Sequence, residues 1–167
     1  MKKIILGLIM ALVLIGCSSK GDESKDITPK LVVGNSLSSL KLNDQFEKAH
    51  TLNANTTKLI FAFSKDVAHT CNDFFETQEA SYLSDNNTQF IADVSAAPSL
   101  IRSMFIMPGL KDFKHTVLIL NEKSIAAPYR SGVDVEKIVI AYLKNGKIVK
   151  IETLNSAKEL QETMETK

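Results

Sequence analysis

The chain has 167 residues, with 20 basic and 19 acidic side chains and a formal net charge of +1. This balance gives no reason to propose nucleic acid as a partner, because proteins that bind nucleic acid usually carry a clear excess of basic charge. Hydrophobic residues make up 44% of the chain, which is typical of a globular protein whose length suits one domain.

The first residues predict a secretory signal. Lys2 and Lys3 precede an apolar run from Ile4 to Gly16, as in a positively charged n-region followed by an apolar h-region. The run is too short to span a bilayer, which takes about 20 apolar residues. It ends in Leu-Ile-Gly-Cys, which resembles the lipobox of bacterial lipoproteins, with cleavage before Cys17. An ordinary signal peptide or a signal anchor is the alternative interpretation.

The lipoprotein resemblance implies that residues 1–16 are removed and that Cys17 carries a thioether-linked diacylglycerol and a further acyl chain such as palmitate. Ser18 resembles the residues that direct lipoproteins to the outer rather than the inner membrane. We therefore expect a lipid-anchored protein of the bacterial envelope that faces the periplasm. Residues 17–33 begin with a polar, charged stretch that predicts a flexible tether. Cys71 would then be the one free thiol.

The remaining chain, residues 34–165, predicts one α/β domain. Residues 37–52 alternate apolar and polar side chains around Asn-Asp-Gln and indicate a hairpin. The apolar run within 58–64 favours a strand that is covered on both faces. A helix is expected from about Cys71 to Leu83, with Thr70 as its N-cap and Asp73 three residues later.

Further strands and helices alternate toward the C-terminus. Strands are expected at 88–95 and 115–120, and a helix that starts with Pro98 is expected over 98–107. Asn145-Gly146 predicts a tight hairpin turn. Ser156 and Glu159 are spaced as a capping box, which predicts a last helix. This order favours a mixed sheet flanked by helices and closed by an antiparallel hairpin.

With these residues, the order resembles the thioredoxin-like superfamily, and especially the membrane-tethered thioredoxins and the peroxiredoxin group. The matching stretches are GNSLSSLKLNDQFEKAHTL, KLIFAFSKD, FIADVSAAPSLIRSMFIM and KNGKIVKIETLNSAKELQETM. The resemblance covers residues 34–165 and implies a central mixed β-sheet flanked by helices.

In thioredoxins the core strand leads into Cys-x-x-Cys at the start of a helix. Aligning Phe63 with the strand phenylalanine places this motif on Ala68, His69, Thr70 and Cys71. Ala68 then replaces the attacking cysteine, and Cys71 corresponds to the second one. The cis-proline position of thioredoxins, just before the facing strand, falls on His115. The resemblance thus implies a degenerate dithiol site.

The peroxiredoxin motif Pro-x-x-x-Thr-x-x-Cys gives a second alignment. Ser64 and Ala68 replace its proline and threonine, whereas Cys71 is kept, and His69 or Thr70 could supply hydrogen-bond donors. A thiolate at the first turn of a helix would be stabilised by free N–H groups and the helix dipole. Cys71 also shares a predicted helix face with aromatic residues, as a buried core cysteine would. Both interpretations of Cys71 stay open.

Other polar residues are ambiguous. Asp93 ends a central strand, where α/β folds place functional groups, or else caps the following turn. Arg102 and Arg130 could stabilise a thiolate, but they are expected to be surface charges. Met104 and Met107 could recreate a soft copper site with Cys71 and His69. Copper proteins of this fold use two cysteines, however, so no metal or other cofactor is expected.

The sequence therefore predicts an envelope lipoprotein whose thioredoxin-like domain is a binding or accessory module rather than an enzyme. Its expected partners are the membrane, through the N-terminal lipid, and an unidentified periplasmic protein. The alternative is a peroxidase-like or other thiol-redox enzyme with Cys71 as nucleophile and His69 as its helper.

Overall fold

The structure, a computed structural model, describes residues 27–166. The expected signal peptide, residues 1–16, and the expected lipidation site, Cys17, lie outside the described residues. None of the helices between residues 27 and 166 combines the length and apolar character that crossing a bilayer requires.

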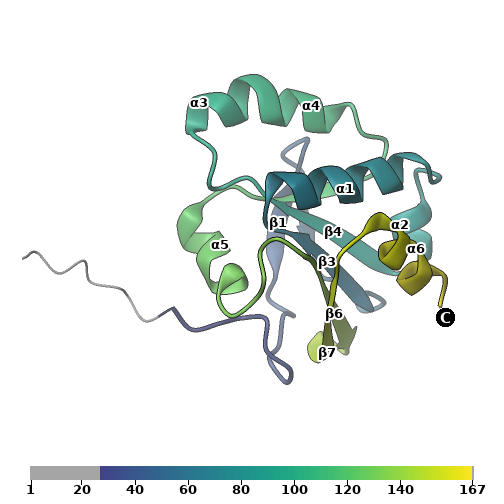
Figure 1. Cartoon of the computed structure of the whole chain (residues 1–167). Helices are drawn as coiled ribbons and strands as arrows, with labels where there is room; N and C mark the ends of the chain where they lie inside the picture. Colours follow the sequence, from purple (N-terminus) through teal and green to yellow (C-terminus); the bar gives the residue numbers. More distant parts are fainter. Residues whose placement is uncertain (1–26, 167) are drawn as a thin grey trace, which may run out of the picture.

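The described chain forms a seven-stranded mixed sheet with the order β2-β1-β5-β4-β3-β6-β7 (Figure 1). The three central strands β3, β4 and β5 are parallel, and every other neighbouring pair is antiparallel. The strands are β1 (Lys41–Asp44), β2 (Ala49–Thr51), β3 (Lys58–Ala62), β4 (Thr88–Asp93), β5 (Val117–Leu120), β6 (Ile138–Lys144) and β7 (Lys147–Leu154).

Helices connect the parallel strands and cover both faces of the sheet. They are α1 (Lys65–Glu76), α2 (Tyr82–Asp85), α3 (Ser99–Ile101), α4 (Met107–Lys111), α5 (Lys123–Arg130) and α6 (Ala157–Glu165). A π-helical turn, η1 (Arg102–Ile106), joins α3 to α4, so residues 99–111 form one continuous helical segment. In Figure 1 this segment lies above α1, and α5 lies to the left of the sheet.

Alternating side chains of the central strands build two cores. Along β3, Ile60 and Ala62 belong to a cluster with residues of α1, α4 and α6. Leu59 and Phe61 belong to a cluster on the other face, with α5 and the segment 31–42. Successive strand side chains point to opposite faces, so a strand covered on both sides has to be apolar at every position.

The two expected hairpins are confirmed. β1 and β2 pair around a turn at Gln45–Lys48, and β6 and β7 pair around Asn145-Gly146. In the β6–β7 turn, Asn145 and Gly146 have positive φ angles of 51° and 73°, as a type I′ hairpin turn requires.

The capping box at the last helix is confirmed with one difference. Ser156 Oγ accepts a hydrogen bond from the Glu159 amide at 3.2 Å. The Glu159 carboxylate accepts from the Asn155 amide at 2.9 Å rather than from Ser156. Two amide donors at the helix start are satisfied by these contacts.

Two expected elements differ from the structure. The helix expected over 71–83 is instead α1, which begins at Lys65 and ends at Glu76, followed by the separate α2. The stretch 123–130, for which no helix or strand was predicted, is α5 despite Pro128. Contacts with the domain also begin within the expected tether: the Lys30 amide donates to the Pro128 carbonyl at 2.8 Å, and Leu31 is buried.

Candidate functional site

The junction between β3 and α1 is the place where the thioredoxin-like resemblance expects the chemistry. β3 ends at Ala62, and Ser64 is the N-cap of α1 with extended backbone, φ −121° and ψ 162°. Its Oγ accepts a hydrogen bond from the Val67 amide at 3.4 Å. Because this serine satisfies an amide that the first turn leaves free, the helix starts directly after the strand.

This early start moves the expected motif away from the junction. Ala68, His69, Thr70 and Cys71 lie in the second turn of α1, and Ser64 to Val67 occupy the strand-to-helix junction instead. The four residues therefore do not lie at the start of the helix, where the resemblance expected them, and the alignment of Ala68 with the attacking cysteine stays a prediction. Thr70 does not cap a helix: its hydroxyl donates to the carbonyl of Asp66, one turn earlier, at 3.0 Å.

Cys71 is a core residue. Its exposed fraction is 0%, and it packs with Val67, Phe74 and Phe75 in the cluster between α1 and the sheet. Burial raises the pKa of the thiol to about 12, because the apolar surroundings disfavour the charged thiolate. The expected position in the first turn of a helix, which would have lowered this pKa, was wrong.

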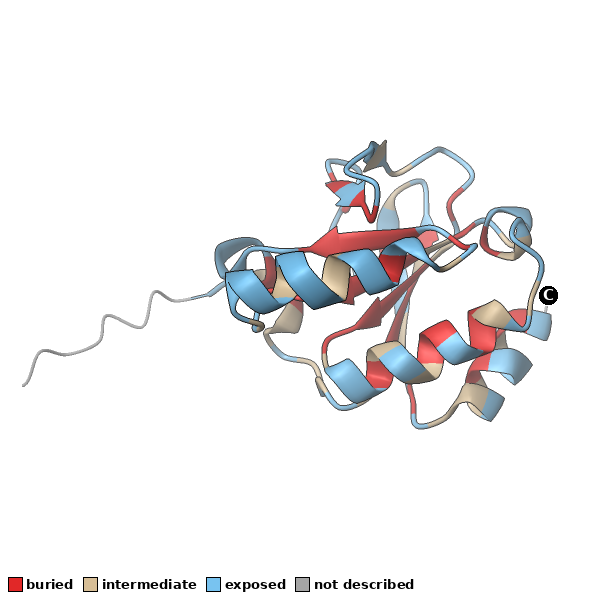
Figure 2. Cartoon of the chain, turned by 90° about the horizontal axis from the view of Figure 1, so that it is seen from above, coloured by how far each residue is buried: buried red, intermediate tan, exposed pale blue. Residues whose placement is uncertain are grey.

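The neighbours of Cys71 on α1 face different directions. His69 is exposed and Ala68 is half-buried, so the imidazole and the Cys71 thiol lie on different sides of the helix. In Figure 2, α1 is the lower of the two long helices, and buried and exposed residues alternate along it. The arrangement does not bring His69 together with Cys71 as a base with its nucleophile.

His115, expected at the cis-proline position, is a buried residue just before β5. Its Nε2 lies 3.0 Å from Asn72 Oδ1, and its Nδ1 lies 3.3 Å from Glu76 Oε1, both on α1. The ring stacks on Phe113 with centroids 5.2 Å apart. Burial lowers the pKa of His115, and the nearby Glu76 carboxylate opposes this shift without cancelling it. No cis peptide bond occurs between residues 27 and 166.

Gln45 fixes the backbone on both sides of this position. Its Nε2 donates to the His115 carbonyl at 2.8 Å, and its Oε1 accepts from the Val117 amide at 2.9 Å. The side chain is 1% exposed, so an unpaired amide there would be costly. Sequence reasoning missed Gln45, since a glutamine in a hairpin turn gives no signal that it pairs with a strand about 70 residues later.

A second polar contact lies at the carboxyl ends of β3 and β4. Arg130 on α5 donates from Nη1 to Asp93 Oδ2 at 2.8 Å and to the Phe63 carbonyl at 3.3 Å. Asp93 Oδ1 accepts from the Ser95 amide at 2.8 Å. The Asp93 carboxylate is 0% exposed and the Arg130 side chain is 33% exposed. Arg130 is thus a structural partner of Asp93, not the free surface charge that was expected.

A cavity lies away from this junction. It has a volume of about 260 Å³ and lies beside β2, α2 and the start of β4, where His50, Asn53 and Gln89 contribute to its lining. Neither Cys71 nor His115 lines it. This cavity therefore does not give a substrate access to the Cys71 thiol.

No family model and no curated sequence matches the chain. Several solved structures are similar to the chain. One is a proposed thiol:disulfide interchange protein of the DsbE type from Chlorobium tepidum, with 17% identity, 80% of this chain and 95% of that chain covered, and a TM-score of 0.53. Another is the exposed lipoprotein thioredoxin Etrx1 from Streptococcus pneumoniae, with 14% identity, 75% and 96% covered, and a TM-score of 0.50.

The peroxidoxin BcpB from Mycobacterium tuberculosis is also similar, with 12% identity, 79% of this chain and 92% of that chain covered, and a TM-score of 0.50. These matches span nearly the whole of the described domain at low identity, so they establish the fold alone. Together with the parallel β3-β4-β5 core and the closing antiparallel hairpin, they show that the chain has the thioredoxin-like fold.

Proposed function

We propose that this chain is a lipoprotein of the bacterial envelope whose thioredoxin-like domain is a binding or accessory module, not a thiol oxidoreductase. Lipid on Cys17 would anchor it, facing the periplasm and favouring the outer membrane, and an unidentified periplasmic protein would be its partner. The lipobox-like end of the apolar N-terminal run and the polar stretch after it support the anchor. Etrx1, a structure similar to this chain, is named an exposed lipoprotein thioredoxin.

The single observation that carries the proposal is the burial of Cys71. Thiol–disulfide exchange needs an accessible attacking thiolate and, in a dithiol enzyme, a second thiol to resolve the mixed disulfide. Cys71 is fully buried with a pKa of about 12. The only other cysteine of the chain is Cys17, which the proposed lipid would consume.

The same observation weighs against the peroxidase alternative. Reduction of a peroxide requires a thiolate that the oxidant can reach, and oxidation of cysteine follows thiolate character and exposure. The Cys71 sulfur lies among Val67, Phe74 and Phe75, and the exposed His69 is on another side of α1. Neither a low pKa nor access supports attack on peroxide.

Two activity assays on the detergent-purified full protein test the redox part. We expect no reduction of insulin disulfides above the dithiothreitol background, and no peroxide consumption above that of a Cys71→Ser variant. Active thioredoxin and peroxiredoxin preparations serve as positive controls in the same detergent. Turnover that disappears in Cys71→Ser would contradict the proposal.

Labelling in bacteria tests the anchoring part. We expect the wild-type chain to incorporate radioactive palmitate and to enter the membrane fraction at the mass of a processed lipoprotein. Cys17→Ser should abolish the label and leave the leader attached, whereas Cys71→Ser should keep both label and processing. Palmitate incorporation that survives Cys17→Ser would overturn the lipidation site.

A further inference from the structure

The helical segment 99–111 is apolar on both of its faces. On the inner face, Leu110 is buried and Ile106 and Met107 pack against the core beneath the segment. On the outer face, four large apolar residues are exposed, and we call them the apolar ridge: Leu100 (64% exposed), Ile101 (42%), Met104 (58%) and Phe105 (64%). Figure 2 shows the segment as mostly exposed above a buried sheet.

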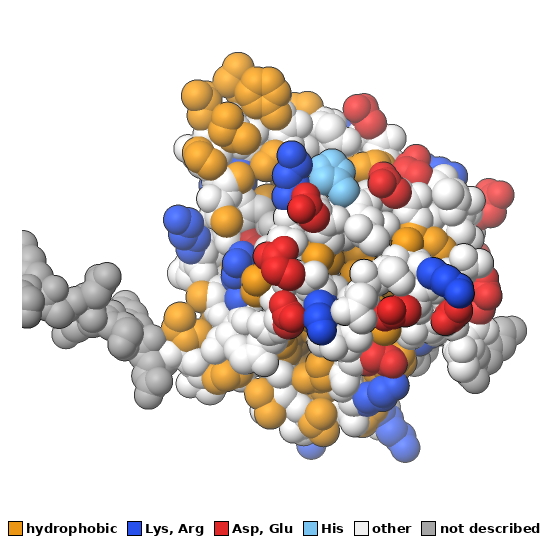
Figure 3. Space-filling model, in the orientation of Figure 1, with side chains coloured by type: hydrophobic (Ala, Val, Ile, Leu, Met, Phe, Trp, Pro, Cys, Tyr) orange, Lys and Arg blue, Asp and Glu red, His pale blue; other side chains and the backbone are white. Residues whose placement is uncertain are grey.

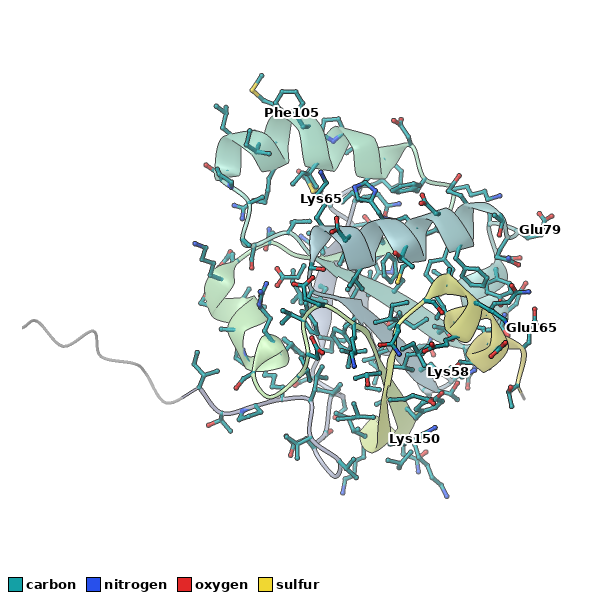
Figure 4. The ribbon with its side chains drawn as sticks, viewed as in Figure 1. Lys58, Lys65, Glu79, Phe105, Lys150 and Glu165 are labelled. Carbon is teal, nitrogen blue, oxygen red and sulfur yellow. The ribbon has the colours of Figure 1, made fainter. Side chains whose placement is uncertain are left out.

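The ridge occupies one corner of the molecule. In Figure 3 its hydrophobic side chains gather over α3 at the upper left, while acidic side chains lie toward the centre and right of that face. In Figure 4 the labelled Phe105 points away from the body of the protein. A helix that is apolar all round is normally buried, and a contiguous exposed apolar patch marks an interaction surface.

The fold holds the ridge outward. Arg102 lies between the ridge residues in sequence, and its Nη1 donates to the Asn121 carbonyl at 2.7 Å. This contact ties the π-helical turn to the end of β5. Because Leu110 is also buried, rotating the segment to hide Phe105 would break a hydrogen bond and expose core residues. The ridge therefore needs a cover from outside the domain.

The composition of the segment fits a lipid surface. Its basic residue Arg102 is tied to the Asn121 carbonyl, whereas Lys111 at its end is exposed. It contains no carboxylate between Ser99 and Lys111. Interfacial helices that lie on bilayers combine Leu and Phe on an apolar face with flanking Lys or Arg, which is attracted to anionic headgroups.

The proposed anchor brings a bilayer within reach. Cys17 precedes Ile27, the first described residue, by 10 positions (27 − 17), which span at most roughly 36 Å when extended. In Figure 1 the first described residues lie at the lower left of the molecule and α3 lies at its upper left. On that side α5 also exposes Ile125, at 41%. A domain held this close to a membrane meets lipid more often than any other apolar surface.

We propose that the apolar ridge inserts into the interfacial region of the bilayer and fixes the orientation of the domain on the membrane. This inference rests on the proposed lipidation of Cys17. The ridge would be a second attachment, in addition to the acyl chains, and would turn the side of the molecule that carries α3 toward the lipid.

Tryptophan fluorescence can test this directly, since the chain contains no tryptophan. Phe105→Trp places a single reporter on the ridge, and Phe46→Trp is the matched control, because Phe46 is an exposed phenylalanine (59%) in the β1–β2 turn. Each full-length lipidated variant is reconstituted into phosphatidylethanolamine–phosphatidylglycerol vesicles with and without brominated acyl chains. Circular dichroism checks that both variants fold like wild type.

We expect the Phe105→Trp emission to shift to the blue and to lose most of its intensity with brominated lipid. The Phe46→Trp emission should stay unshifted and be quenched by aqueous acrylamide instead. Equal emission and equal quenching in the two variants would overturn the inference. So would a blue shift of Phe105→Trp without quenching by brominated lipid, which would assign the ridge to a protein partner or a second copy.

Mass spectrometry of the N-terminal peptide from the same samples separates the two proposals. Acylated Cys17 together with an unquenched Phe105→Trp would leave the lipoprotein intact and refute the ridge. Unmodified Cys17 would refute the anchor whatever the fluorescence shows.

Discussion

At the scale of single residues, the fate of Cys71 depends on where its helix begins. Composition and spacing left both a reactive thiol and a core thiol open, with the core thiol favoured. Starting α1 at Lys65 places Cys71 seven residues into the helix and against the sheet. Helical spacing relates the apolar residues Val67, Cys71, Phe74 and Phe75. This spacing favours a helix that begins before residue 67, whereas alignment of the thioredoxin motif with residues 68–71 favoured a later start.

Substitutions at Cys71 should behave as core substitutions. We expect Cys71→Ala to lower the free energy of unfolding by about 1 kcal/mol, through a small cavity. Cys71→Ser should cost more, about 1–3 kcal/mol, because it buries a hydroxyl in an apolar cluster. Urea denaturation measures both. Equal stability of Cys71→Ser and wild type would contradict complete burial of this side chain.

His115 should make the stability depend on pH. Its pKa is lowered in the folded protein, so between that value and about 6.5, its usual value, the unfolded chain binds more protons. Stability is therefore full above about pH 6.5 and falls as the pH drops through and below that value.

Urea midpoints at pH 7.5 and 5.5 measure this effect. We expect His115→Gln to reduce the difference between the two midpoints, and His69→Gln, at an exposed position on α1, to leave it unchanged. An identical pH dependence in His115→Gln and wild type would show that the buried imidazole is not its source.

At the scale of elements, the start of α1 decides how the candidate site is interpreted. Ser64→Ala removes the observed N-cap and should cost about 0.5–2 kcal/mol of stability. Thr70→Ala changes a residue inside the helix, where alanine is a better helix former, so we expect less than about 0.5 kcal/mol of change. If Thr70→Ala lost more stability than Ser64→Ala, the helix would instead begin after Thr70.

Some elements were predictable because one local signal was enough. The apolar runs gave β3 to β6, Asn145-Gly146 gave the last turn, and Ser156 with Glu159 gave the start of α6. Others depend on distant contacts. Helix α5 contains Pro128, which argues locally against a helix, yet the Pro128 carbonyl pairs with Lys30 and Tyr129 packs in the core.

The candidate site was less predictable than the fold for the same reason. Gln45 bonds to the backbone beside His115, and Arg130 pairs with Asp93 across 37 residues of sequence. Neither pairing produces a spacing or a periodicity that could be detected without the fold.

At the scale of the whole molecule, the thioredoxin-like fold is present without an accessible cysteine in the described residues. The sheet order, the parallel core and the closing hairpin are thioredoxin-like, but Ser64 is the N-cap of α1 and Cys71 of that helix is buried. The same scaffold exposes the apolar ridge on one side and carries the proposed lipid anchor at its N-terminus. These features are the basis of the proposal that the domain is a binding module and not a thiol oxidoreductase.

The most direct test of the central claim is the rate at which Cys71 reacts with a disulfide reagent in the folded, detergent-purified protein. A Ser64→Cys, Cys71→Ala variant is the matched control, since it moves the thiol to the N-cap, where a helix lowers a cysteine pKa. We predict rapid labelling of the control and, for wild type, labelling only as fast as the domain unfolds, with one thiol per chain released in denaturant. Rapid labelling of Cys71 in the folded wild-type protein would contradict the account.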